Sequence, residues 1–196
     1  MDSTTAKRPA SSPRYSHEIA AAVTLPAAAR ALVDTAALTT ADAIAVATGC
    51  GALATRIGLL RFLADPDRVA SGTVAPVDPF CDGMPAALVG RGPSPDRDRL
   101  RHAGDRCVES WRIMTRTADG VRATHGVPPV VAVAGVSGAV GVAGALALGA
   151  WCSWALGSEL RAATRARYAL DLRADDPLAM LVDRLCRIRR RPAWRT

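Results

Sequence analysis

The sequence predicts an all-α protein, and three observations carry that prediction. Alanine, the best helix former, is abundant, and leucine and arginine, which also favour helices, are frequent. Apolar residues recur at steps of three and four along several segments, whereas the alternation typical of strands is hard to find. The segment 127–158 contains no charged residue and consists mostly of valine, alanine, leucine and glycine. An apolar helix of this kind lies either at the centre of a bundle or in a membrane.

Length and composition indicate one domain. The chain has 196 residues, of which 49% are hydrophobic, and this is enough apolar material for a core. Residues 1–14 are polar and include two prolines, so we expect a disordered tail followed by a single helical domain over residues 15–196. The N-terminal residues include no apolar run of the kind that a secretory signal needs.

The cysteines and histidines are too scattered for a metal site or a disulfide framework. The five cysteines are odd in number and include no CxxC pair, and the three histidines are isolated. This usage favours a reducing compartment. The sequence also lacks a glycine-rich phosphate loop followed by lysine, and it lacks a nucleophile elbow. We therefore expect no metal, no cofactor and no enzymatic activity.

The N-terminal part of the domain predicts two helical segments. Residues 17–38 have a helical pattern with a break or a new start at Pro26, because proline removes a backbone donor. Residues 39–64 predict one longer helix, with Thr39 as its cap and Asp42 in its first turn.

A long loop is predicted to follow, over residues 65–95. This segment holds six prolines and four glycines, which weaken regular structure, and we expect only a short helical turn at 86–89 within it. A loop of this length is uncommon in a compact domain and is usually functional or disordered.

The next helix is predicted from residue 96 to about residue 121. Its apolar residues form one narrow stripe flanked by arginines: Leu100, Ala103, Cys107, Trp111 and Met114. Such an amphipathic helix can pack against a core or lie in a groove. Near the end of the chain, residues 159–173 predict a charged helix, and Asp175-Asp176-Pro177 is typical of a helix start.

A cluster of arginines near the C-terminus accounts for much of the net charge of +7. Its members are Arg184, Arg187, Arg189, Arg190, Arg191 and Arg195. The cluster is either a solvated helix end or a surface for anionic lipid. Nucleic acid is the weaker hypothesis, because no aromatic residues are interleaved for base stacking, and we expect no nucleic-acid partner.

The segment LRHAGDRC, from Leu100 to Cys107, lies within the amphipathic helix. Leu100 would be an apolar anchor, and Ala103 and Gly104 are small enough for another helix to approach closely. Asp105 offers a carboxylate to an arginine at a groove rim, and Cys107 closes the stripe one turn later. The segment resembles the BH3 motif of the Bcl-2 family, which has a leucine, two residues, a small residue, Gly-Asp and an apolar residue.

The apolar run resembles the BH1 region and the central helix of the same family. The resemblance places five residues at the floor of a groove: Val136, Val140, Val142, Ala143 and Leu146. Family members that bind BH3 helices usually carry Asn-Trp-Gly-Arg in BH1, and Ser137-Gly138-Ala139-Val140 stands there in this chain. The arginine that would pair with a ligand's aspartate is therefore absent, and we expect Arg112 or Arg122 to replace it. Trp194 falls near the position of the BH2 tryptophan.

The resemblance implies a fold and a function. The fold would be a Bcl-2-like bundle with an apolar central helix surrounded by amphipathic helices, most similar to a divergent viral Bcl-2 homologue. Such a protein regulates apoptosis, most often as an inhibitor, by binding BH3 helices of pro-apoptotic partners in a hydrophobic groove. It would act in the cytoplasm of the host cell, or at mitochondrial or other intracellular membranes.

A small integral membrane protein is the alternative. Residues 127–157 are long enough to span a bilayer, and their glycines include small-xxx-small spacings suited to packing in lipid. Against this interpretation, Pro128-Pro129 and the glycines weaken an isolated helix. The two hypotheses stay open together, because a bundle could also associate with a membrane through its apolar helix.

Overall fold

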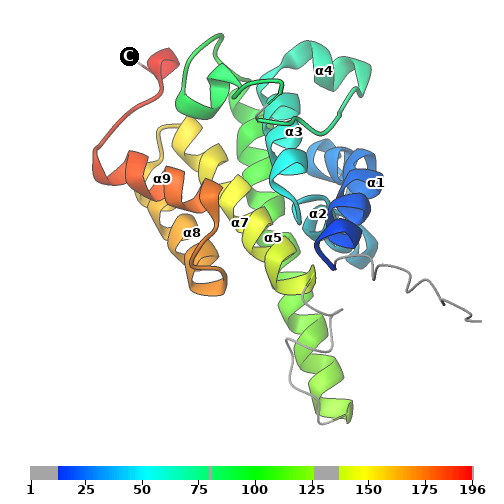
Figure 1. Cartoon of the computed structure of the whole chain (residues 1–196). Coiled ribbons are helices and arrows are strands. Elements are labelled where there is room, and N and C mark those ends of the chain that lie inside the picture. The colour runs from blue at the N-terminus through cyan, green and yellow to red at the C-terminus, as the bar shows by residue number, and fades with distance from the viewer. Residues whose placement is uncertain (1–12, 80, 126–136, 196) are drawn as a thin grey trace, which may run out of the picture.

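The computed structural model describes residues 13–79, 81–125 and 137–195, and every regular element in these ranges is helical. The all-α class predicted from the sequence is thus confirmed for this part of the chain (Figure 1). The α-helices are α1 (Pro13–Val33), α2 (Thr40–Gly49), α3 (Leu53–Ala64), α4 (Pro66–Ser71), α5 (Arg97–His125), α7 (Ser137–Ala155), α8 (Glu159–Leu172) and α9 (Pro177–Arg187). Two 3₁₀ helices, η1 (Ala86–Val89) and η2 (Ala193–Arg195), complete the elements.

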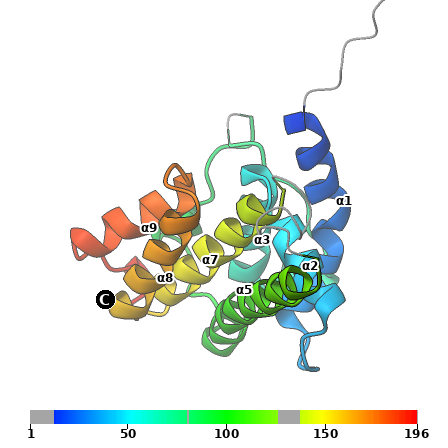
Figure 2. The same ribbon diagram turned by 90° about the horizontal axis from the view of Figure 1, so that it is seen from below.

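Helix α7 is the centre of the bundle. Figure 2 shows it between α8 and α9 on one side and α1 to α3 on the other, with α5 crossing beneath. Every residue from 143 to 155 is buried, as expected for a helix that other helices surround. The same helix is long and apolar enough to cross a membrane, yet 78% of the window Gly138–Ala155 is buried inside the protein.

Glycines let other elements approach α7 closely. A Cβ atom added to Gly141 would collide with the backbone carbonyl of Ala47, and one added to Gly144 would collide with that of Cys50. The Ala47 carbonyl lies near the C-terminal end of α2, and Cys50 is the residue that follows this helix. Glycine within a helix costs ~1 kcal/mol relative to alanine, and the close packing of α2 on α7 offsets that cost.

The break predicted at Pro26 is wrong, because α1 runs through it without interruption. Pro26 leaves the carbonyl of Ala22 without its helical partner, and both residues are exposed, so water can satisfy the free oxygen. Leu25, Ala28 and Leu32 are buried and anchor the helix on either side of the proline.

The single helix predicted over residues 39–64 is also wrong, because the structure has two helices, α2 and α3, bent by 111° at a short break. The predicted start is confirmed: the Thr39 hydroxyl accepts a bond from the Asp42 amide at 3.1 Å, and the Asp42 carboxylate accepts one from the Thr39 amide. Gly49 and Gly51 flank the break, and glycine weakens helix continuation.

The segment predicted as a long loop contains more structure than expected. Helix α4 was not predicted, although Asp65 caps it and Pro66 stands in its first turn. The predicted turn at 86–89 is confirmed as η1. The backbone between these elements is held against α3, where the Val77 amide donates to the Ala54 carbonyl at 3.0 Å.

The two C-terminal helices begin at the predicted residues, and α8 ends one residue before its predicted end. Asp176 caps α9 by accepting bonds from the amides of Leu178 and Ala179, and Pro177 stands in the first turn. At the other end of the chain, α1 begins at Pro13, and most of the predicted tail of residues 1–14 lies outside the described residues.

Candidate functional site: the contact of α5 with α7 and α8

The BH3-like residues lie on the inner face of α5. Leu100 is 1% exposed, and Ala103 and Cys107 are 0% exposed, so the stripe predicted from the sequence is buried. Gly104, between them, faces α7. The motif is therefore packed within its own chain and is not displayed at the surface.

Two glycines mark the point where α5 and α7 cross. A Cβ atom added to Gly104 would lie 3.1 Å from Cβ of Cys152, and one added to Gly149 would lie 3.0 Å from Cβ of Cys107. Each glycine thus faces a cysteine of the other helix. The close approach that the small residues predicted is present, and α7 supplies the opposing helix.

An arginine from α8 completes the contact. Arg165 donates from Nη2 to the Asp105 carboxylate at 2.5 Å, and from Nη1 to the Gly149 carbonyl at 3.3 Å and the Ser153 hydroxyl at 3.0 Å. The Arg165 side chain is 12% exposed and that of Asp105 is 56% exposed, so the pair lies at the edge of the core. We call Asp105–Arg165 the rim pair.

Arg165 was not singled out in the sequence, although its spacing offered a clue. It lies on α8 between Ala162, Ala166 and Ala169, which are all buried. Alanines at this spacing let α8 approach α7, and an arginine three residues after Ala162 shares part of that face. A search for charged residues within small-residue stripes would have found it.

The residues predicted to form a groove floor are divided between the core and the surface. Ala143 and Leu146 are 0% and 1% exposed and are covered by the chain's own helices. Val140 and Val142 are half-buried. Val136 lies outside the described residues. In this structure, a ligand has no access to Ala143 or Leu146.

An open hollow lies beside the start of α5. It is a cavity of about 560 Å³ lined by Val33 and Val69 and by charged residues of both signs from the start of α5, Asp105 among them. Its mixed lining differs from the apolar floor that the resemblance implies.

Trp194, the BH2-like residue, is half-buried and fixes the C-terminal segment. Its indole N–H donates to the Ala155 carbonyl at 3.1 Å, at the end of α7. The indole N–H of Trp154, which belongs to α7, donates to the Arg190 carbonyl of the C-terminal segment at 2.7 Å. The two tryptophans therefore hold residues 190–194 against the end of the central helix.

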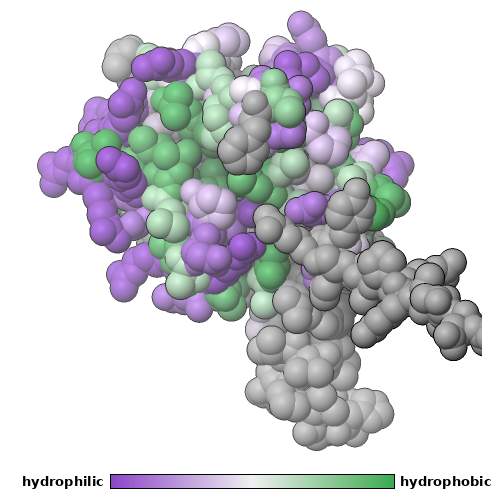
Figure 3. Space-filling model, in the orientation of Figure 1, coloured by the Kyte–Doolittle hydropathy of each residue, from purple (hydrophilic) through white to green (hydrophobic). Residues whose placement is uncertain are grey.

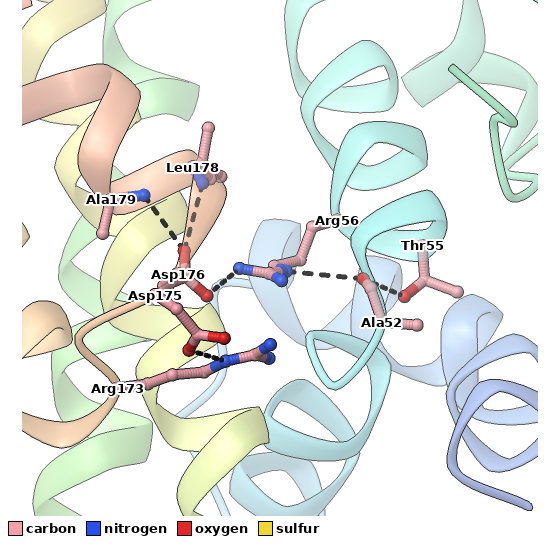
Figure 4. A network of polar contacts seen from close by, with 8 residues as sticks. All are labelled: Ala52, Thr55, Arg56, Arg173, Asp175, Asp176, Leu178 and Ala179. Atoms are coloured by element: carbon pink, nitrogen blue, oxygen red, sulfur yellow. Dashed lines mark hydrogen bonds and ion pairs between the residues drawn. The ribbon is translucent and has the colours of Figure 1, made fainter. Parts of the chain in front are cut away.

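A second arginine–aspartate pair lies deep in the bundle (Figure 4). Arg56 of α3 bonds to the Asp176 carboxylate, and the two side chains are 1% and 0% exposed. Asp176 also caps α9, and the Arg56 Nε donates to the Ala52 carbonyl at 3.4 Å. We call Arg56–Asp176 the buried pair. The sequence analysis explained Asp176 only as a cap and missed its partner, 120 residues away.

The buried cysteines are poor nucleophiles. Burial raises the pKa of Cys50 and of Cys152 to about 12, and it raises the pKa of Cys107 well above its usual value. The reactive form of cysteine is the thiolate, which is scarce at neutral pH when the pKa is so high. Across the described ranges, no three histidine, cysteine or acidic residues are grouped so that they could hold a metal ion.

Comparisons with known proteins add no family assignment: no family model, no curated protein and no solved structure matches the chain. The contact of α5 with α7 and α8 is therefore interpreted from its own geometry.

Proposed function

We propose that this chain is a Bcl-2-like regulator of apoptosis that binds BH3 helices, and that its own α5 occupies the binding groove. The observation that carries the proposal is the rim pair beside the Gly104–Gly149 crossing. A BH3 helix in a groove is expected to place its small residues against an apolar floor and its aspartate against an arginine. Here α7 is the floor, and Arg165 is the arginine.

Because α5 occupies the proposed groove, a partner helix would have to compete with it. A partner helix would have to displace the stripe of α5 and then pair with Arg165. The apparent affinity of a protein falls with the fraction of molecules in the competent state. Changes that weaken the hold of α5 without removing Arg165 should therefore strengthen binding.

The test is a titration of the full chain, without detergent, against labelled BH3 peptides. Wild-type protein should bind weakly and saturably. Asp105→Asn should bind more tightly, by up to about fivefold, because it loosens α5 and leaves Arg165 free for the peptide's aspartate. Arg165→Gln should bind more weakly than wild type, because the peptide's aspartate then has no partner.

Asp98→Asn is the matched control. Asp98 lies on the same helix and pairs with Arg101 at 3.0 Å, but its side chain is 89% exposed. It should leave binding unchanged. If neither wild type nor Asp105→Asn binds any BH3 peptide while both are folded, the proposed function is wrong.

The direction of regulation follows the resemblance: sequestering BH3 helices would protect the host cell from death. We propose action in the cytoplasm, or at mitochondrial or other intracellular membranes. Expression in cells exposed to a death stimulus should reduce caspase activation, and Arg165→Gln should reduce the effect. Increased death on expression would reverse the proposed direction.

A small integral membrane protein stays the second candidate, because α7 has the length and apolarity of a span. The burial of α7 supports the bundle instead, since a span would expose its side chains to lipid. A chain that stays in solution only in detergent would favour the membrane protein, and a monomer in plain buffer would favour the bundle.

A further inference from the structure

The C-terminal end of the molecule carries a surface that neither the α5 contact nor the fold explains. Six exposed arginines gather there: Arg184, Arg187, Arg189, Arg190, Arg191 and Arg195. We call them the C-terminal basic surface. Arg187 pairs with Asp183 at 2.6 Å, and within the described ranges none of the other five forms an ion pair. Most of this charge is therefore available to a partner.

Two exposed apolar side chains accompany the arginines. Ile188 is 60% exposed and follows Arg187 at the end of α9, and Leu160 is 83% exposed in the first turn of α8. The two helix ends lie together, because the Cys186 Sγ contacts the Glu159 carbonyl at 3.8 Å. Figure 3 shows hydrophobic side chains among hydrophilic ones at its left edge, where α9 ends in Figure 1.

The segment that carries the arginines is firmly fixed. The Arg190 carbonyl accepts from Trp154 at 2.7 Å, the Ala193 amide donates to the Gly90 carbonyl at 2.7 Å, and Trp194 donates to Ala155. Pro192 packs on Gly90, where an added Cβ would lie 2.6 Å from its Cα. A partner would therefore meet an ordered array of charges and would not have to order the backbone.

One arginine is held in a conformation that costs free energy. Arg189 has φ of 51°, the left-handed region that favours glycine. It ends α9 in a Schellman motif, in which the Arg189 amide donates to Cys186 and the Arg190 amide to Leu185. Glycine or asparagine is usual at this position. An arginine there places a charge on the surface at the expense of stability, which is a feature of functional sites.

We propose that the C-terminal basic surface binds anionic lipid membranes, with Ile188 and Leu160 entering the interface while α7 stays buried. Basic residues near an anionic leaflet attract it, and apolar side chains supply the second contribution that stable peripheral binding needs. This site is independent of the proposed BH3 binding, because it lies at the ends of α8 and α9 and involves none of the residues of the α5 contact.

The test is sedimentation of the full chain with vesicles of phosphatidylcholine, alone or mixed with phosphatidylserine. The protein should bind only the mixed vesicles, and salt should release it. Arg189→Gly with Arg191→Gln should lower the partition by about fivefold for each charge. Ile188→Ser with Leu160→Ser should also weaken binding, and the remaining binding should be more sensitive to salt.

The control pair, Arg30→Gln with Arg61→Gln, has the same net charge but alters exposed arginines of α1 and α3. It should bind nearly as well as wild type. Arg189→Gly alone should raise the unfolding midpoint, because glycine relieves the backbone, so a loss of binding cannot come from misfolding. Equal binding to neutral vesicles, an equal loss in the control pair, or no vesicle binding would each overturn the proposal.

Discussion

The two arginine–aspartate pairs share their chemistry and differ in their surroundings. In each, an arginine joins a carboxylate from another part of the bundle and also donates to a backbone carbonyl, that of Ala52 for Arg56 and that of Gly149 for Arg165. The buried pair is 1% and 0% exposed, whereas the rim pair is 12% and 56% exposed. A charge that loses its partner in the core stays desolvated, whereas one at the rim is rescued by water. An arginine–aspartate pair can therefore fix a contact when it is buried and leave a contact able to open when it lies at the rim.

The glycines near the two pairs also have different nearest neighbours, backbone atoms near the buried pair and side-chain atoms near the rim pair. Near the buried pair, Gly144 of α7 faces the carbonyl of Cys50, a backbone atom that cannot turn aside. Near the rim pair, Gly104 faces the end of the Arg165 side chain and Cβ of Cys152. At the crossing of α5 with α7, an added Cβ would therefore meet side-chain atoms first, whereas at the junction of α2 with α7 it would collide with the backbone. The proposed displacement of α5 needs such a difference.

The largest effect is expected from removing one member of the buried pair. Arg56→Met should lower the free energy of unfolding by about 3–5 kcal/mol, because Asp176 is left as an unpaired buried charge. Asp176→Asn, which keeps a capping oxygen, should cost a similar amount through unpaired Arg56. The double variant should cost clearly less than the sum of the two. Urea denaturation gives the free energy of unfolding of the wild type and the three variants. If the losses of the two single variants add up to that of the double variant, the two side chains do not interact directly.

The next largest difference is expected between two alanine substitutions on α7, one at Gly144 near the buried pair and one at Gly149 near the rim pair. Gly144→Ala should lower the free energy of unfolding by about 1–3 kcal/mol through overpacking, despite the better helix propensity of alanine. Gly149→Ala should cost less, because its added Cβ would lie 3.0 Å from Cβ of Cys107 and 3.2 Å from the Gly104 carbonyl oxygen, whereas the one at Gly144 would lie 2.1 Å from the Cys50 carbonyl oxygen. Thermal unfolding of both variants tests the order, and the reverse order would contradict the rigid character of the junction at Cys50.

Alkaline pH should weaken both regions. Burial raises the pKa of Cys50 and Cys152 from 9.0 to about 12, so the folded state holds their protons more tightly than the unfolded state. This contribution is fully present below pH 9 and is lost as pH rises towards 12. Urea denaturation at increasing pH should show falling stability above pH 9, with a smaller fall in Cys50→Ala and Cys152→Ala. An unchanged slope in both variants would exclude the cysteines as the cause.

The smallest effect on stability is expected at the rim pair. Asp105→Asn should lower the free energy of unfolding by only about 0–1 kcal/mol, since its carboxylate is largely solvated. Denaturation in the presence of added salt is the check, because an exposed pair is screened. A loss as large as that of Arg56→Met would show that α5 is as firmly fixed as the core.

The parts of this fold that the sequence predicted depend on residues close together in the chain. The Thr39–Asp42 cap, the apolar stripe of α5 and the Asp176-Pro177 start all lie within a few turns, and all are present in the structure. Helix α4 was missed despite its local Asp65-Pro66 start, but two other misses depend on distant partners. Arg56 meets Asp176 across 120 residues, and the bend between α2 and α3 places Cys50 on a glycine of α7. Periodicity carries no information on such contacts.

Hydrogen exchange on α5 with and without a BH3 peptide tests the central claim most directly, that α5 is a displaceable occupant of the groove. At saturating peptide, amides of residues 100–114 should exchange faster, while those of residues 143–155 in α7 stay protected, because the peptide replaces α5 on the same floor. Unchanged or stronger protection of α5 at saturating peptide would show that this helix is a fixed wall of the bundle.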